Sequence, residues 1–378
     1  MKIDTLCLHA NDEYKDEYGS LTMPIYQSAT FAHKGIDDNG LYSYSRLSNP
    51  TRKHLEDVVA KLENGAGSVA FSTGMAAITA TFKLFKSKDH IISSDDLYGG
   101  AIRLFNNFCI DEGIEFDFVD TTNPCNITEK IKENTKAIYI ETPTNPLIKV
   151  SDLNEIIKIA KKYNLLVIVD NTFLTPYFQR PLELGADIVI HSGTKYLGGH
   201  NDTLAGFVVT RTEGLLEKII YVSKTIGANL SPFDSFLIER GIKTLALRMD
   251  RINDNAIKIA NYLKDLKEVK KIYYVGLKDN PGYEINLKQS SGFGGMISIE
   301  LESKELALKI LKNVKIFRYA ESLGGVDSLI TYPMKQTHAD VPEEERNKRG
   351  INDKFLRISV GIENPIDLIE DLKEAIYG

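Results

Sequence analysis

Two ionisable side chains and one small-residue turn each follow directly on an apolar stretch. Asp170 ends the run LLVIVD, Lys195 follows the run ADIVIH after a Ser-Gly-Thr turn, and residues 72–75 follow a third such run just before a helical pattern. Ligands of open α/β sheets bind outside the carboxyl ends of the strands, so we expect the three features to meet there. They offer a carboxylate, an amine nucleophile, and backbone N–H groups that suit an anion.

This combination matches the needs of pyridoxal phosphate. Its aldehyde requires a lysine for a Schiff base, its ring nitrogen an anion, and its phosphate hydrogen-bond donors; Lys195, Asp170 and the turn at Gly74 and Met75 supply them. Other signatures fail. The G-x-G-x-x-A match at 65–70 follows a helix and precedes a strand, the reverse of a dinucleotide site. The sequence has no phosphate-loop or nucleophile-elbow motif, and its histidines lack metal-ligand spacing. We predict this cofactor and no metal.

The elements that must position these residues alternate along the chain. We expect a helix from Asn49 as its cap, and further helices at the following ranges: 76–85, 100–112 and 151–163, the last capped by Ser151. Apolar runs predict strands at the following ranges: 68–72, 90–94, 114–120, 136–142, 165–170, 187–192 and 205–211. Several runs are apolar on both faces, as a parallel sheet covered by helices requires. The predicted fold class is α/β, with a doubly wound, mostly parallel sheet.

The remaining residues predict two more parts. A long helical stretch from about 231 to 266, interrupted near Gly241, bridges to a smaller α+β domain in which strand and helix patterns alternate. We expect an extended arm at 1–48, a large domain at 49–245 and the smaller domain at 246–378.

Composition excludes several classes of protein. Acidic residues outnumber basic ones, 52 to 46, for a formal charge of -6, and Lys and Arg are not concentrated with aromatics, so we expect no nucleic-acid partner. The three cysteines are too few and too scattered for a disulfide framework. The charged N-terminus does not suit a signal peptide, and no apolar run is long enough to span a membrane. We expect a cytoplasmic protein without membrane contact.

Eight segments in order along nearly the whole chain resemble the cysteine and methionine metabolism family of pyridoxal-phosphate enzymes. The segments are YSRLSNPT (44–51), STGMAA (72–77), DLYGG (96–100), ETPTNP (141–146), VDNTF (169–173), HSGTKYLGGH (191–200), ESLGG (321–325) and RISVGIE (357–363). The resemblance implies the aspartate aminotransferase fold, type I. It also implies a trans-sulfuration activity on a small sulfur amino acid.

The resemblance implies a role for each matched residue. Lys195 would hold the cofactor and move protons, Asp170 would pair with the ring nitrogen, and Tyr98 would stack on the ring and help activate the leaving group. Further cofactor contacts implied are Gly74, Met75, Ser192 and Thr194, and substrate contacts Asn145, Glu321, Ser322 and Arg357. Glu321 would meet the distal amino group and Arg357 the carboxylate. Structural alternatives stay open: Tyr98 as a packed aromatic, the two hydroxyls as turn caps, and Arg357 in an internal ion pair.

Tyr44 and Arg46 matter for assembly. In similar enzymes this pair reaches the phosphate of a neighbouring subunit, which implies a homodimer with shared sites, and similar enzymes form tetramers. The alternative is a surface turn before Asn49 and Pro50.

The reaction is predicted to be cleavage of cystathionine by a carbon-sulfur lyase, through gamma or beta elimination, with release of hydrogen sulfide from cysteine as a side reaction. The alternatives are a cystathionine gamma-synthase or homoserine-ester sulfhydrylase, and a non-catalytic oligomer that binds the cofactor. Gly100 stands where methionine gamma-lyases typically carry cysteine, which disfavours that activity.

Overall fold

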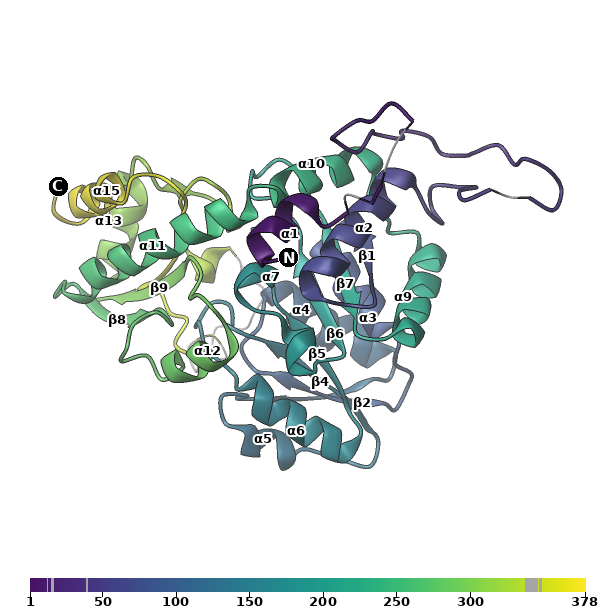
Figure 1. The fold of residues 1–378 in the computed structure, drawn as a ribbon. Helices are drawn as coiled ribbons and strands as arrows, with labels where there is room; N and C mark the ends of the chain where they lie inside the picture. Colours follow the sequence, from purple (N-terminus) through teal and green to yellow (C-terminus); the bar gives the residue numbers. More distant parts are fainter. Residues whose placement is uncertain (12, 15–16, 39, 337–345, 347–348) are drawn as a thin grey trace.

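The computed structural model describes residues 1–378 except 12, 15–16, 39, 337–345 and 347–348. Two β-sheets with flanking helices form the body, and the long helix α11 (Leu245–Lys264) runs from one to the other (Figure 1). The first half of α11 packs into the core beside the larger sheet through Leu245, Met249 and Ile252, and its second half into the core of the smaller sheet. The predicted bridging helix is therefore present.

The larger sheet has seven strands in the order β1-β7-β6-β5-β4-β2-β3. Its strands are β1 (Gly67–Phe71), β2 (His90–Ser94), β3 (Glu115–Val119), β4 (Thr135–Glu141), β5 (Leu166–Asp170), β6 (Ile188–Ser192) and β7 (Gly206–Thr210). Across the sheet, the five strands β3, β2, β4, β5 and β6 run parallel to one another. Strand β7 is antiparallel to both of its neighbours, β1 and β6. The predicted α/β class with a mostly parallel sheet is confirmed.

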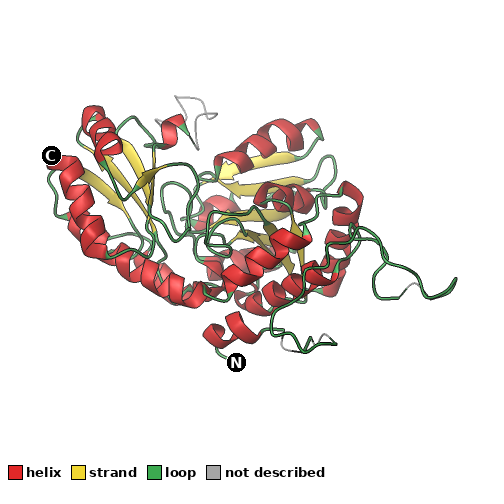
Figure 2. Cartoon of the chain, turned by 90° about the horizontal axis from the view of Figure 1, so that it is seen from above, coloured by secondary structure: helices red, strands yellow, loops and turns green. Residues whose placement is uncertain are grey.

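Helices cover both faces of this sheet (Figure 2). They are α2 (Pro50–Glu63), α3 (Gly74–Phe82), α4 (Gly99–Arg103) with a π-helical continuation (Leu104–Cys109), α5 (Pro124–Thr128), α6 (Leu153–Tyr163), α7 (Thr175–Phe178), α8 (Pro181–Leu184), α9 (Glu213–Ile226) and α10 (Pro232–Ile242). Asn49 caps α2 as predicted, accepting from the N–H groups of Thr51 and Arg52. The prediction of Ser151 as the cap of α6 is wrong: Asp152 takes that place and accepts from the N–H of Glu155.

The smaller sheet has five strands in the order β10-β11-β12-β9-β8. Its elements are β8 (Val269–Tyr273), α12 (Tyr283–Gln289), β9 (Met296–Leu301), α13 (Lys304–Asn313), β10 (Arg318–Tyr319), β11 (Leu329–Thr331), a 3-10 turn (Pro333–Lys335), β12 (Phe355–Ser359) and α15 (Pro365–Tyr377). Helices α13 and α15 pack together beside it. The division of the chain at residues 48 and 245 stays a prediction.

The N-terminal residues differ in part from the extended arm that the sequence predicts. Residues Ile3–His9 form helix α1, which packs against α2 and α11 and buries Cys7. Beyond α1, a segment that we call the arm, residues 17–38 and 40–48, projects from the body at the upper right of Figure 1. Three of its apolar side chains, Leu21, Ile36 and Leu41, are more than 90% exposed.

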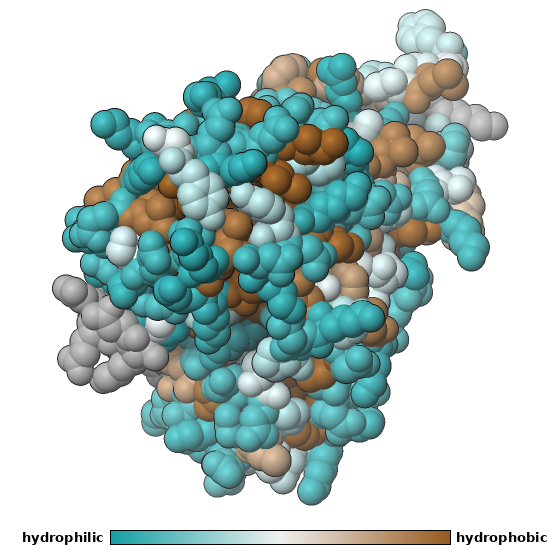
Figure 3. All heavy atoms as spheres, turned by 90° about the vertical axis from the view of Figure 1, so that its left-hand side faces the viewer, coloured by the Kyte–Doolittle hydropathy of each residue, from teal (hydrophilic) through white to brown (hydrophobic). Residues whose placement is uncertain are grey.

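The opposite end of the molecule has a different surface. Figure 3 views the left-hand side of Figure 1, where the smaller sheet lies, and hydrophilic side chains dominate that face, with apolar ones showing between them. Among the described residues, none of the helices combines the length and the apolar character needed to cross a bilayer.

Candidate active site

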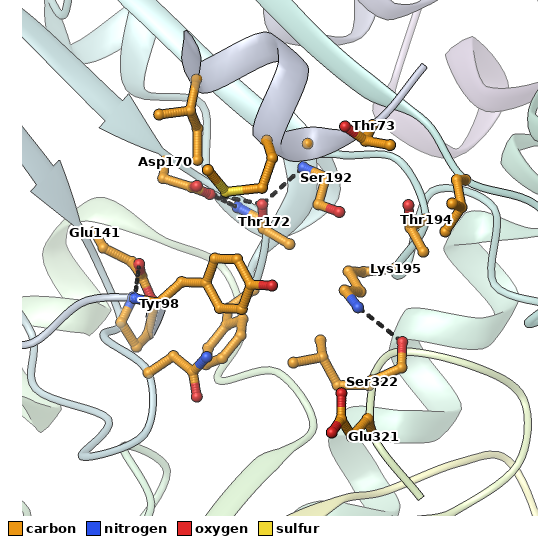
Figure 4. A pocket seen from close by; sticks show the side chains of 18 of the residues that line it. Thr73, Tyr98, Glu141, Asp170, Thr172, Ser192, Thr194, Lys195, Glu321 and Ser322 are labelled. Carbon is orange, nitrogen blue, oxygen red and sulfur yellow. Dashed lines mark hydrogen bonds between the residues drawn. The ribbon is translucent and has the colours of Figure 1, made fainter. Parts of the chain in front are cut away.

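A cavity of about 430 Å³ lies at the carboxyl ends of β4, β5 and β6 (Figure 4). Eleven of the residues predicted from the sequence line it together. They are Gly74, Met75, Tyr98, Asn145, Asp170, Ser192, Thr194, Lys195, Glu321, Ser322 and Arg357. The sheet therefore brings the predicted groups to one place, with residues 321–323 and Arg357 of β12 closing the other side.

Lys195 projects into the middle of this cavity from the turn after β6 (Figure 4). Its Nζ donates a hydrogen bond to Ser322 Oγ at 2.7 Å. Burial lowers the pKa of the amine to about 8; Arg357 adds to the effect and Glu321 opposes it. An appreciable fraction of the amine is neutral near physiological pH, which is the form that attacks a carbonyl or accepts a proton.

Asp170 sits at the end of β5, held by the residue two positions on. Its Oδ1 accepts from the backbone N–H of Thr172 at 3.1 Å and from the Thr172 hydroxyl at 2.6 Å. The same hydroxyl oxygen accepts from the N–H of Ser192 at 2.9 Å, which ties the end of β5 to the end of β6. Burial raises the pKa of Asp170, whereas the two Thr172 hydrogen bonds lower it.

Glu141 lies beside Asp170 at the end of β4, where the two residues are partners in the sheet register. Its Oε2 accepts from the backbone N–H of Tyr98 at 2.9 Å. Burial, followed by the charge of Asp170, raises the pKa of Glu141 well above its ordinary value. Two adjacent buried carboxyl groups do not both ionise readily, and the hydrogen bonds from Thr172 favour the charge on Asp170 over a charge on Glu141.

The start of α3 forms an anion cradle. The Thr73 hydroxyl caps the helix by accepting from the N–H of Ala76 at 3.0 Å, while the first N–H groups, those of Gly74 and Met75, have no intrahelical acceptor. A Cβ at Gly74 would stand 2.9 Å from Ser192 Cβ, and one at Gly206 only 2.1 Å from the carbonyl oxygen of Thr73. Glycine at both positions therefore lets β7 and the turn after β6 approach this helix start.

The hydroxyl of Thr194 also has a local partner. Its oxygen accepts from the N–H of Ala205 at 3.0 Å, and the hydroxyl lies 3.3 Å from the Ala205 carbonyl oxygen. The turn-cap interpretation therefore describes part of what this side chain does, and the residue still lines the cavity.

Arg357 reaches the cavity from β12 and is 1% exposed. Its Nη1 donates to Asn145 Oδ1 at 2.9 Å, and its Nη2 to the Ser322 carbonyl and the Thr331 hydroxyl at 3.0 and 3.2 Å. Its Nε has no partner, and in the part of the chain that the structure describes no carboxylate pairs with it. Burial lowers its pKa to about 10. A buried cation with a free donor at a cavity wall is suited to binding a carboxylate from solution.

Tyr98 stands at the start of α4, and its ring lies across the cavity from Lys195 (Figure 4). A Cβ at Gly100 would come within 2.5 Å of Tyr98 Cε1 and 2.8 Å of Met75 Sδ. The ring position seen here therefore requires glycine at 100, in keeping with the departure noted in the sequence.

Tyr44 and Arg46 do not line the cavity of their own chain. Arg46 Nη1 donates to the carbonyl of Lys224 at 2.7 Å, and its guanidinium lies 5.5 Å from the centre of the Tyr44 ring. Both residues belong to the arm.

Sequence reasoning missed two polar residues that line the cavity, Glu141 and Thr172, whereas Thr73 lies in the turn at 72–75 that it did single out. A signal for Glu141 was available, because it directly follows an apolar strand as Asp170 does. The residues present fit pyridoxal phosphate: an amine of lowered pKa, a buried carboxylate, and a helix start at which glycines clear the space beside free N–H groups.

Comparison with known proteins agrees with this geometry. The family model for Cys/Met metabolism PLP-dependent enzymes matches residues 4–377. The chain belongs to this family. It is therefore a pyridoxal-phosphate enzyme of the trans-sulfuration group, as the motifs predict.

Three bacterial members of the family are similar to this protein over nearly its whole length. The cystathionine gamma-lyase of Bacillus subtilis (strain 168) is 50% identical, covering 100% of this chain and 99% of its own. The cystathionine beta-lyase of Lactococcus lactis subsp. cremoris (strain MG1363) is 49% identical, covering 99% and 98%. The crystal structure of cystathionine gamma-lyase from Lactobacillus plantarum complexed with L-serine superposes with a TM-score of 0.97 at 44% identity, covering 99% and 98%.

Proposed function

We propose that this enzyme is a carbon-sulfur lyase that cleaves cystathionine by gamma or beta elimination. The observation that carries the proposal is the convergence of Lys195, Asp170 and Arg357 on one cavity. Relatives that are 50 and 49% identical bear the names cystathionine gamma-lyase and beta-lyase, which supports the substrate and leaves the position of cleavage to experiment.

Four groups of residues would hold the cofactor. Gly74, Met75, Ser192 and Thr194, which line the cavity, would hold its phosphate; Lys195 would bind its aldehyde and Asp170 would pair with its ring nitrogen, with Tyr98 beside the ring. When bound, pyridoxal phosphate supplies a carbonyl for the amine and a protonated ring that takes up the electron pair left on the substrate's α carbon. The two hydrogen bonds from Thr172 favour the charged form of Asp170, and that charge would keep the ring nitrogen of the bound cofactor protonated.

The substrate would be oriented by Arg357 through its carboxylate, with Asn145 and Ser322 fixing the guanidinium. The free amine of Lys195 would accept the proton from the α carbon of the substrate and would return it to a carbon further along the substrate; a pKa of about 8 suits both directions of transfer. The hydrogen bond from Lys195 Nζ to Ser322 Oγ, 2.7 Å long, would orient the amine.

Product analysis tests the reaction. Gamma elimination of cystathionine with water yields cysteine, ammonia and 2-oxobutanoate, whereas beta elimination yields homocysteine, ammonia and pyruvate. We expect one of these sets from the purified enzyme and none from Lys195→Ala, and hydrogen sulfide from cysteine alone at a lower rate. Faster net formation of cystathionine from cysteine plus an acylated homoserine than cleavage would instead establish a synthase.

A spectroscopic test separates an enzyme from a non-catalytic binder. We expect the purified protein to absorb in the visible range with the cofactor bound to Lys195, and Lys195→Ala to lose that absorbance. A cofactor-loaded wild type that turns over none of the substrates above would contradict the proposal and favour the binding module.

We further propose that the enzyme is a homodimer with shared sites, assembled into a tetramer, with Tyr44 and Arg46 contributed to the neighbouring site. In support, the arm carries almost fully exposed apolar side chains, and this pair is absent from the cavity of its own chain. Mixing Arg46→Ala with Lys195→Ala protein should restore activity in mixed dimers. Absence of recovery despite demonstrated subunit exchange would contradict donation between subunits.

A cytoplasmic location is proposed as well. Its support is the state of the three cysteines, which are all free thiols, two of them buried.

A further inference from the structure

Two loops beside the cavity each carry one of the residues that line it. The β2–α4 loop, residues 95–98, ends in Tyr98, and the β4–α6 loop, residues 142–152, contains Asn145. Asn145 Oδ1 accepts from Arg357 Nη1 at 2.9 Å, so the position of this amide bears on the guanidinium that would bind the substrate's carboxylate. Whatever fixes Asn145 therefore influences how well Arg357 is oriented.

A buried carboxylate of the first loop holds the second loop. Asp96 is 1% exposed and does not line the cavity. Its Oδ2 accepts from the hydroxyl of Thr144 and from the backbone N–H of Leu147, the latter at 3.2 Å. The Thr144 hydroxyl oxygen also accepts from the N–H of Lys149 at 2.9 Å, so both its oxygen and its hydrogen are engaged. Asp96 thus contacts the second loop on both sides of Asn145.

The carboxylate of Asp96 is ionised near neutral pH. Burial raises the pKa of this carboxyl to about 6, and the charge of Asp95 acts in the same direction. The Thr144 hydroxyl, the charge of Lys149 and the Leu147 N–H oppose the rise. Hydrogen bonds to an ionised acceptor are stronger than those between neutral groups, and Oδ2 accepts both of them. Its other oxygen, Oδ1, is buried without a partner among the described residues, so the link between the loops depends on Oδ2.

The second loop needs this support because its backbone is strained. Ile148 has a φ of +55°, in the left-handed region, where a β-branched residue is an outlier. Such a conformation persists only when its surroundings hold it. The N–H of Ile148 donates to the Thr144 carbonyl at 3.1 Å, and the N–H of Thr144 donates to the Lys149 carbonyl at 3.0 Å. These bonds close the loop on itself, and Asp96 attaches the closed loop to the end of β2.

A second link between the loops runs in the opposite direction. Glu141, the last residue of β4, accepts from the backbone N–H of Tyr98 at 2.9 Å (Figure 4). Each loop is therefore held by a carboxylate that belongs to the other side: Asp96 holds residues 144–147, and Glu141 holds Tyr98. The two loops are fixed as a pair.

We propose that Asp96 is a positioning residue for recognition of the substrate's α-carboxylate: it holds the backbone on both sides of Asn145, and Asn145 in turn orients Arg357. Asp96 acts through these residues and does not touch the substrate. The inference rests on one part of the proposed function, the binding of a carboxylate by Arg357, and it applies whichever bond of the substrate is cleaved.

Two small amines test this assignment. L-Alanine has an α-carboxylate and no leaving group, and ethylamine is the same molecule without the carboxylate. Binding of each amine to the enzyme with pyridoxal phosphate bound is followed by the change in visible absorbance, so no turnover is needed. The ratio of Kd for ethylamine to Kd for L-alanine measures carboxylate recognition. In Asp96→Ala this ratio should fall roughly tenfold, the size expected for loss of a hydrogen bond that fixes a charged group.

Three further variants make the test specific. Asp96→Asn keeps an oxygen for both donors, so its ratio should stay within about threefold of wild type. Thr144→Val removes the hydroxyl from the other side of the contact and should lower the ratio as Asp96→Ala does, which provides the test if that variant fails to fold. The matched control is Asp95→Ala: Lys149 keeps its ion pair with Asp120, and the ratio should stay within about twofold of wild type.

The outcomes separate this inference from the proposed function. An unchanged ratio in both Asp96→Ala and Thr144→Val, or an equal loss of affinity for the two amines, would overturn the role of Asp96. A wild-type ratio near one would show instead that Arg357 binds no carboxylate, which removes that part of the proposed function and the inference with it.

Discussion

Replacing the proposed catalytic lysine should stabilise the cofactor-free protein. In the folded chain the pKa of Lys195 is lowered from 10.5 to about 8, chiefly by burial and then by Arg357. The unfolded chain therefore binds more protons than the folded chain between about pH 8 and 10.5, and stability rises with pH across that window. Below pH 8 the full cost of burying the ammonium group is present. Lys195→Met keeps the length of the side chain and removes this cost.

The magnitude follows from the same two pKa values. A tenfold change in an acid constant corresponds to about 1.4 kcal/mol, so lowering the pKa from 10.5 to about 8 costs roughly 3 kcal/mol near pH 7. The variant also loses the hydrogen bond to Ser322, worth about 1 kcal/mol. We expect a net gain of about 2 kcal/mol near pH 7, shrinking to well under 1 kcal/mol at about pH 9.5.

The assay is urea unfolding of cofactor-free protein followed by far-ultraviolet circular dichroism, because the chain contains no tryptophan. The cofactor must be removed, since it binds the wild type and would stabilise it by linkage. Lys61→Met, at an exposed position of α2, is the control and should change little. A variant no more stable than wild type near pH 7, or a gain that persists unchanged at high pH, would refute the reasoning.

Three further substitutions have expected outcomes. Glu141→Gln keeps an acceptor for the Tyr98 N–H but removes a carboxyl group with a raised pKa. Because of that raised pKa, the wild type loses stability as the pH rises above the ordinary pKa of glutamate. The Tm of the variant minus that of the wild type should therefore increase from acidic to alkaline pH in differential scanning calorimetry. Arg357→Lys cannot reproduce the fork that contacts Asn145 and Ser322, so KM for cystathionine should rise roughly tenfold or more in steady-state kinetics, with a smaller effect on kcat. Gly206→Ala places a methyl group 2.1 Å from the Thr73 carbonyl, and thermal unfolding should show a loss of roughly 1–3 kcal/mol together with weaker cofactor binding in a spectroscopic titration.

The sequence was most informative where burial dictates residue type. The central strands of the larger sheet are buried on both faces, so their apolar runs are visible in the sequence alone, and the polar residue that ends such a run is conspicuous. That rule found Asp170, and applied evenly it would also have found Glu141. The apolar spacing of Ile3, Leu6, Cys7 and Ala10 likewise indicates the helix α1, which the extended-arm interpretation overlooked.

Other features lay beyond sequence reasoning for physical reasons. Strand β10 is two residues long, too short for any periodicity to show. The cap of α6 was misplaced by one residue because serine and aspartate cap equally well and stand side by side. The contacts of Arg357 with Asn145 and Ser322 join separate parts of the chain, and nothing local in β12 indicates which side chains it meets.

The two buried cations of the cavity are coupled, and this coupling gives substrate binding a consequence for proton transfer. The charge of Arg357 is the second cause of the lowered pKa of Lys195. A carboxylate bound at Arg357 would offset that charge, so the free amine of Lys195 would gain affinity for a proton when the substrate is in place. In cofactor-free protein, saturation with an unreactive small carboxylate should therefore raise the pKa of Lys195, measured by NMR of the labelled amine, and the rise should vanish in Arg357→Leu. A pKa that does not respond to the carboxylate would show that the two cations act independently.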